Sequence, residues 1–119
     1  MYTDSRKDCA VSLLAPPIEE LWIGPVRVVV RYGCVRRDQY ELLTTEPFPA
    51  SLRQHLEPLG VIRGSAVLYT VDVANTHQLT VAPARGRMVI MPRLSVERTQ
   101  QRQSALAIAE RLSVLMKES

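Results

Sequence analysis

Apolar and polar positions divide the middle of the chain into short strands. The stretch from Ser65 to Pro92 contains three β-type runs separated by short polar breaks, which predicts an antiparallel meander. Its last run, Met88–Met91, is apolar at every position, so neither face of that strand is expected to meet solvent. Something must therefore cover both faces, either the chain's own helices or a second copy of the protein.

A second pair of strands is predicted nearer the N-terminus. Residues 26–45 are rich in β-branched side chains and contain a polar break, which indicates a β-hairpin. Successive side chains of a strand point to opposite faces of the sheet. One face is therefore expected to carry Val26, Val28, Val30 and Tyr32, and the other Arg27, Val29 and Arg31.

Two helices complete the pattern. The first is predicted from Ala50 to about Leu59, with leucines at helical spacing and Gly60 as a C-terminal cap. The second is predicted from Val96 to about Lys117, with Ser95 as its N-cap. The first half of this helix is almost wholly polar and is expected to be solvated. Its second half is expected to bury Ala105, Ile108, Leu112 and Leu115.

The order of these elements, β-β-α-β-β-β-α, predicts an α+β fold. We expect one two-layer domain, in which a mostly antiparallel sheet of about five strands packs against two helices. The domain should span residues 17–119, after a polar and flexible N-terminal head at residues 1–16. A chain of 119 residues can bury an adequate core without metal or disulfide staples.

The composition is that of an ordinary globular domain, and the sequence leads us to expect no cofactor. The apolar fraction is 46% and the charged fraction 23%, whereas a disordered chain would have fewer aliphatic residues. We expect a cytoplasmic protein without membrane association, because neither a secretory signal nor an apolar run of bilayer length is visible. Cys9 and Cys34 fit no zinc or redox spacing, so two free thiols and no metal are expected.

Three hypotheses for the function follow from the sequence, and catalysis ranks third among them. His55 and His77 are the only histidines, and His55 is expected to be a partly exposed helical residue without a role. His77 lies near Asp72 in sequence, and an Asp–His pair could act as a general base. No spacing singles out a nucleophile, and no familiar catalytic or phosphate-binding motif is present. Any enzyme would therefore be one without a recognisable motif.

Nucleic-acid binding is the second hypothesis. Residues 85–119 contain seven Lys or Arg against three Asp or Glu. Arg93, Arg98 and Arg102 surround the start of the last helix, with glutamines between them, and both residue types bind phosphates or base edges. A polar, arginine-rich helix face is nevertheless more often only solvated.

The leading hypothesis is a non-enzymatic small binding or regulatory domain that acts as a homodimer. Its ligand, a small molecule or a protein partner, is unknown. The homodimer is inferred from Met88–Met91, because two helices cannot cover both faces of such a strand. Arg27 and Arg31 could hold an anionic group where they project opposite the valines, and solvated strand charges are the alternative.

Overall fold

The computed structural model describes residues 19–31, 38–73, 76–93 and 96–118, which form one antiparallel sheet and two α-helices. The head at residues 1–16, Tyr32, both cysteines and Ser95 lie outside the described residues. The strands are β1 (Glu19–Ile23), β2 (Val26–Arg31), β3 (Gln39–Leu43), β4 (Gly60–Gly64), β5 (Tyr69–Val73), β6 (His77–Ala82) and β7 (Arg87–Pro92). The helices are α2 (Leu52–Leu56) and α3 (Arg98–Glu118), with 3-10 turns η1 (Glu57–Leu59) and η2 (Pro83–Arg85).

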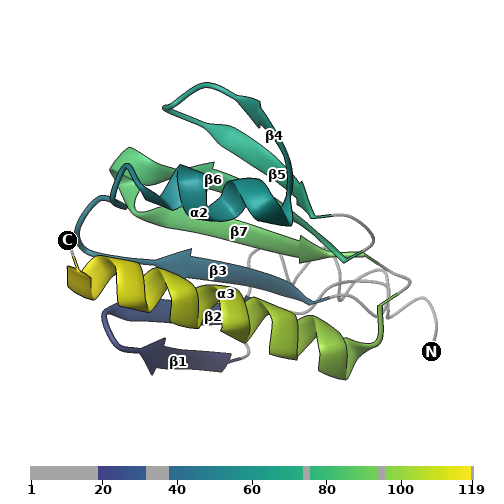
Figure 1. The fold of residues 1–119 in the computed structure, drawn as a ribbon. Coiled ribbons are helices and arrows are strands. Elements are labelled where there is room, and N and C mark those ends of the chain that lie inside the picture. The colour runs from purple at the N-terminus through teal and green to yellow at the C-terminus, as the bar shows by residue number, and fades with distance from the viewer. Residues whose placement is uncertain (1–18, 32–37, 74–75, 94–95, 119) are drawn as a thin grey trace.

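The sheet has the strand order β1-β2-β3-β7-β6-β5-β4, and each strand pairs with its neighbours in antiparallel fashion. Both helices lie on one side of it, α3 across β1–β3 and α2 nearer β5 and β6 (Figure 1). The hairpin β2–β3 and the strands β5, β6 and β7 confirm the predicted α+β class. This arrangement places β1 and β4 at the two edges of the sheet.

The predicted number of about five strands is too low, because β1 and β4 escape the sequence pattern. β1 begins with Glu19 and Glu20, so it lacks an alternating apolar face. β4 begins at Gly60, which was expected to cap the preceding helix but has an extended φ of 174°. Residues 65–68, expected to begin a strand, form a turn in which the Ser65 hydroxyl accepts hydrogen bonds from the amides of Val67 and Leu68.

The core lies between the sheet and the two helices, on what we call the helix face. Val26, Val28 and Val30 lie there as predicted, together with Tyr40, Leu42, Val71, Leu79, Met88 and Ile90. α2 and α3 cover these residues with Leu52, Leu56, Ala105, Ala109 and Leu112. The Arg53 guanidinium also lies 5.1 Å from the centre of the Tyr69 ring, which ties α2 to β5.

The opposite side of the sheet, the arginine face, carries Arg27, Arg31, Arg63 and Arg87. No described helix lies along it (Figure 1). The alternation predicted for β2 is confirmed, since Arg27, Val29 and Arg31 all lie on this face. Val89 and Met91 also lie here and are half-buried, whereas Met88 and Ile90 are in the core. Part of the apolar run Met88–Met91 therefore stays accessible.

Helix α3 agrees with its predicted range but not fully with its predicted faces. Ala105, Leu112 and Leu115 are buried as expected, whereas Ile108 is only half-buried. The first half was expected to be solvated, yet Gln101 is fully buried. A buried amide needs hydrogen-bond partners, and the side-chain nitrogen of Gln101 donates to the carbonyl oxygen of Val96 at 2.7 Å. Gln101 thus anchors the polar start of α3, although its polarity led us to expect it in solvent.

Candidate functional site

Each of the five arginines predicted to bind a ligand or nucleic acid forms an ion pair within the chain. Such pairs offset the positive charge that an anionic ligand would meet. The bidentate pair of Arg102 with Glu19, at 2.8 and 2.7 Å, also lowers the pKa of the Glu19 carboxyl. The other pairs are Arg27–Glu20 (2.5 Å), Arg31–Glu41 (3.4 Å), Arg93–Asp72 (2.7 Å) and Arg98–Asp38 (3.5 Å).

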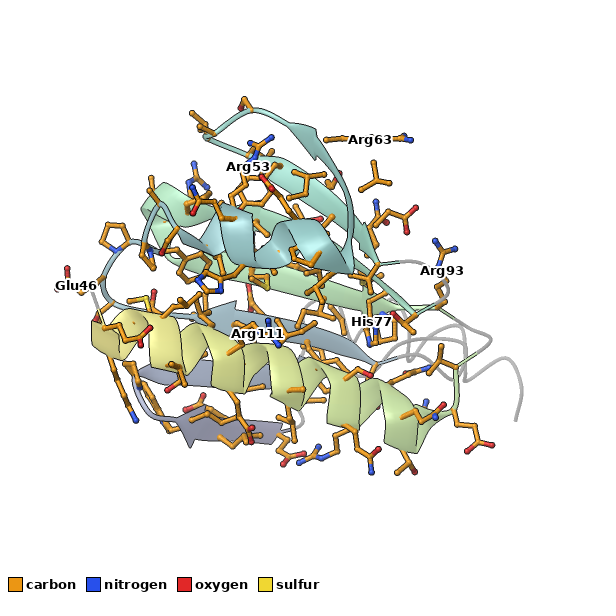
Figure 2. All side chains as sticks on the ribbon, in the orientation of Figure 1. Glu46, Arg53, Arg63, His77, Arg93 and Arg111 are labelled. Carbon is orange, nitrogen blue, oxygen red and sulfur yellow. The ribbon has the colours of Figure 1, made fainter. Side chains whose placement is uncertain are left out.

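The structure does not gather these arginines into one patch. Arg27 and Arg31 project from the arginine face of β2. Arg98 and Arg102 lie on α3, on the other side of the sheet, where Arg102 reaches Glu19 of the edge strand β1. Arg93 follows β7 and pairs with Asp72, at the end of the molecule where Figure 2 shows it. No single flat polyanion therefore contacts all five.

A buried carboxylate organises the centre of the arginine face. Glu41 of β3 accepts hydrogen bonds from Arg31 at 3.4 Å and from Arg87 at 2.5 Å. A buried charge is tolerated only when it is paired in this way. Arg87 was considered from the sequence only as a possible neighbour of the phosphate-binding arginines, and Glu41 was not singled out. The available signal was the alternation of β3, which puts Glu41 on the face opposite Tyr40 and Leu42. This cluster binds the sheet together and leaves one net positive charge.

His77 is a core residue and does not form the predicted pair with Asp72. Only 1% of its surface is exposed, and it lies on the helix face opposite Val73. Asp72 precedes Val73 by one residue, so alternation sends its side chain to the arginine face. Figure 2 shows His77 between the sheet and α3. Burial lowers the pKa of His77, and a hydrogen bond to the backbone of Gln101 partly opposes this effect.

The lowered pKa of His77 predicts that acid destabilises the fold. An unfolded His titrates near pH 6.5. As the pH falls below that value, the unfolded chain binds a proton that native His77 resists, so stability drops until the lower native pKa is passed. Urea unfolding at pH 7.5 and 5.5 should show this loss in the parent and in the exposed control His55→Gln. In His77→Gln the difference should shrink, and an unchanged difference would assign the effect to other groups.

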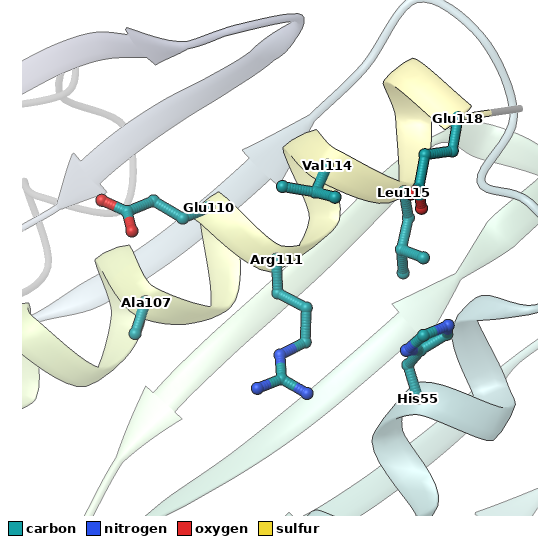
Figure 3. Close-up of a pocket in the computed structure, with 7 residues that line it drawn as sticks. All are labelled: His55, Ala107, Glu110, Arg111, Val114, Leu115 and Glu118. Carbon is teal, nitrogen blue, oxygen red and sulfur yellow. The ribbon is translucent and has the colours of Figure 1, made fainter.

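A groove of about 450 Å³ lies between the two helices. His55 of α2 faces Arg111 and Leu115 of α3 across it (Figure 3). Its lining mixes charges of both signs with small apolar surfaces, contributed by His55, Ala107, Glu110, Arg111, Val114, Leu115 and Glu118. The groove could accept an amphipathic segment, but its chemistry selects no particular ligand. His55 is exposed, as expected from the sequence.

Exposed apolar side chains gather at one edge of the sheet. The described residues include five large apolar side chains that are exposed, and three of them, Val61, Val67 and Leu68, lie on β4 and the turn that follows. The other two, Trp22 on β1 and Val114 on α3, are separate from this group. We call these three residues the β4 patch. Single exposed apolar side chains are normal, but three of them on and beside an edge strand define a candidate interaction surface.

Neither described helix has an apolar stretch long enough to cross a bilayer. Within the described ranges, His, Cys, Asp and Glu also do not form a cluster of three that could hold a metal ion. Comparison of the chain with protein-family models, with curated proteins and with solved structures finds no significant match.

Proposed function

We propose that this protein is a non-enzymatic binding domain that acts as a homodimer. The β4 patch is the observation that carries the proposal, because three exposed apolar side chains lie on an edge strand and the turn that follows it. Burying an apolar side chain of this size contributes about 1.5–3 kcal/mol, so association through the patch is favourable. The half-buried Val89 and Met91 on the arginine face add accessible apolar area.

The roles of the ionisable groups support a binding domain over an enzyme. His77 is packed in the core, on the opposite side of the sheet from Asp72. The predicted binding arginines hold ion pairs that connect strands and helix. The buried Gln101 and the Arg102–Glu19 pair give the start of α3 a structural role, which ranks nucleic-acid binding second.

The homodimer predicts the mass of the protein in solution. Light scattering at low micromolar concentration should give about twice the chain mass of 13.4 kDa. A gel-shift assay with mixed DNA or RNA at about 50 mM salt and about 10 μM protein tests the alternative, because even non-specific binders register there. We expect no shift. A monomer that shifts nucleic acid, and loses the shift when Arg93, Arg98 and Arg102 are replaced by Gln, would reverse the ranking.

A further inference from the structure

The free edge of β4 exposes main-chain groups at known positions. β4 is the last strand of the sheet and pairs only with β5 among the described strands. The amide of Ser65 donates to the carbonyl oxygen of Leu68 at 3.0 Å, which continues the β4–β5 register by one step. Hydrogen-bonded and non-hydrogen-bonded pairs alternate along an antiparallel ladder. Val61 and Arg63 therefore bond to β5, and the N–H and C=O groups of Gly60 and Ile62 point to the free edge.

A second contact supports this assignment. A Cβ atom at Gly60 would collide with the carbonyl oxygen of Asp72, so that oxygen points toward β4. Asp72 is the register partner of Val61, as the alternation requires for a hydrogen-bonded pair. Glycine at position 60 therefore lets β4 approach the Asp72 carbonyl of β5 closely. Since glycine has no side chain, it also does not shield the main-chain groups of β4 that point to the free edge.

The two edges of the sheet differ in their protection against pairing. β1 begins with two glutamates, and both hold ion pairs, with Arg102 and Arg27. Charges on an edge strand discourage a further strand from adding to the sheet. β4 has the sequence Gly-Val-Ile-Arg-Gly, with one charge and two glycines, and the β4 patch beside it. The described structure therefore leaves β4 as the edge able to accept another strand.

We propose, building on the homodimer, that β4 pairs with β4 of a second copy in antiparallel fashion about a two-fold axis at Ile62. The two Ile62 residues then face each other and exchange both main-chain hydrogen bonds. Val61 of one copy lies opposite the partner's Arg63 on the arginine face, and Gly60 lies opposite the partner's Gly64. The two seven-stranded sheets become one continuous sheet, and Val61 and Arg63 of both copies lie at its centre.

A second copy fits this edge through its own symmetry. The strand has five residues with Ile62 in the middle, so the same outward groups serve as donors and acceptors on both sides. Arg63 is exposed, and no carboxylate of the described chain pairs with it; Figure 2 shows it extending from the β4–β5 hairpin. Opposite Val61 its methylene groups would pack on the valine, since arginine covers apolar surface with its stem.

Charges placed at Val61 test both the edge and the register. In Val61→Lys the new charge faces the partner's Arg63 twice in the dimer, and like charges directly opposite in a sheet are destabilising. The dimer dissociation constant, measured by sedimentation velocity, should rise at least about tenfold. In Val61→Glu the charges are opposite, so the dissociation constant should stay equal or fall. Combining Val61→Lys with Arg63→Glu should restore the dimer.

Trp22→Lys is the matched control. Trp22 lies on the arginine face of the other edge strand and is 60% exposed, compared with 57% for Val61. Its replacement should leave the dissociation constant unchanged, and far-UV circular dichroism should show every variant folded. Equal weakening by Val61→Lys and Val61→Glu would overturn the register. If only Trp22→Lys dissociated the dimer, the β4 interface would be overturned and the homodimer would stand. A monomeric parent protein would overturn the β4 interface and the homodimer together.

Discussion

Replacing Leu112 with alanine should lower the free energy of unfolding by about 2–5 kcal/mol. Leu112 is fully buried at the centre of the α3 face that packs on the sheet. Truncation removes buried methyl groups and leaves a cavity that rigid strands on one side cannot fill. Urea denaturation followed by circular dichroism measures the loss directly.

Two exposed positions of the same helix serve as controls for Leu112→Ala. Val114→Ala removes two methyl groups from a side chain that lies mostly in solvent. Arg102→Ala breaks the ion pair with Glu19, and exposed pairs of this kind contribute about 0–1 kcal/mol. Both variants should lose about 1 kcal/mol or less. Losses as large as that of Leu112→Ala would mean that another side of α3 faces the core.

Replacing Gly86 with valine should also be strongly destabilising. Gly86 follows η2 with φ 60° and ψ 41°, a left-handed conformation that costs other residues about 1–3 kcal/mol. A Cβ here would lie 2.5 Å from Thr44 Oγ1 and 2.7 Å from the Thr44 carbonyl oxygen. The Thr44 amide, in the segment after β3, also donates a hydrogen bond to the carbonyl oxygen of Gly86 at 2.9 Å. In Gly86→Val, the strain of the left-handed backbone and the collision of the new side chain with Thr44 therefore add to one another, directly before β7.

Ala84→Val is the control for the loop, since it adds methyl groups two residues earlier at an exposed position. Thermal unfolding should place its midpoint close to that of the parent, with Gly86→Val several degrees lower. A Gly86→Val midpoint equal to that of Ala84→Val would show that the loop relaxes without cost. The sequence indicated this glycine, because Pro83 and Gly86 bracket a tight turn between two apolar strands.

The parts of the fold with regular periodicity were predictable from sequence. A regular spacing of apolar residues marks β2, the central strands and the long helix α3. One physical cause dominates each of these patterns, namely that one face of the element is buried. β1 and β4 lack that pattern because edge strands bury little. Gly60 was misleading, since glycine serves both helix caps and close strand contacts, and only the neighbouring Asp72 carbonyl distinguishes them.

The candidate site was harder to predict because ion pairs and shared faces of the sheet join residues that are distant in sequence. Sequence identifies Arg102 as basic, but its partner Glu19 lies 83 residues away. Asp72 and His77 are close in sequence and yet face opposite sides of the sheet. Val67 and Leu68 resemble buried strand residues until Ser65 turns the chain and leaves them exposed. The β4 patch therefore emerges only from the folded chain.

The distance between two copies of one labelled residue tests the homodimer and its interface most directly. In a Cys9→Ser, Cys34→Ser background, nitroxide labels would be attached at Thr80→Cys on β6 or at Trp22→Cys on β1. β6 and its copy would be five strand spacings apart, and β1 and its copy thirteen. At about 4.8 Å per spacing, pulsed electron paramagnetic resonance should give about 25 Å for Thr80→Cys and about 60 Å for Trp22→Cys. A shorter distance at Trp22→Cys than at Thr80→Cys, or no dipolar coupling at either position, would contradict the pairing of β4 with a second copy.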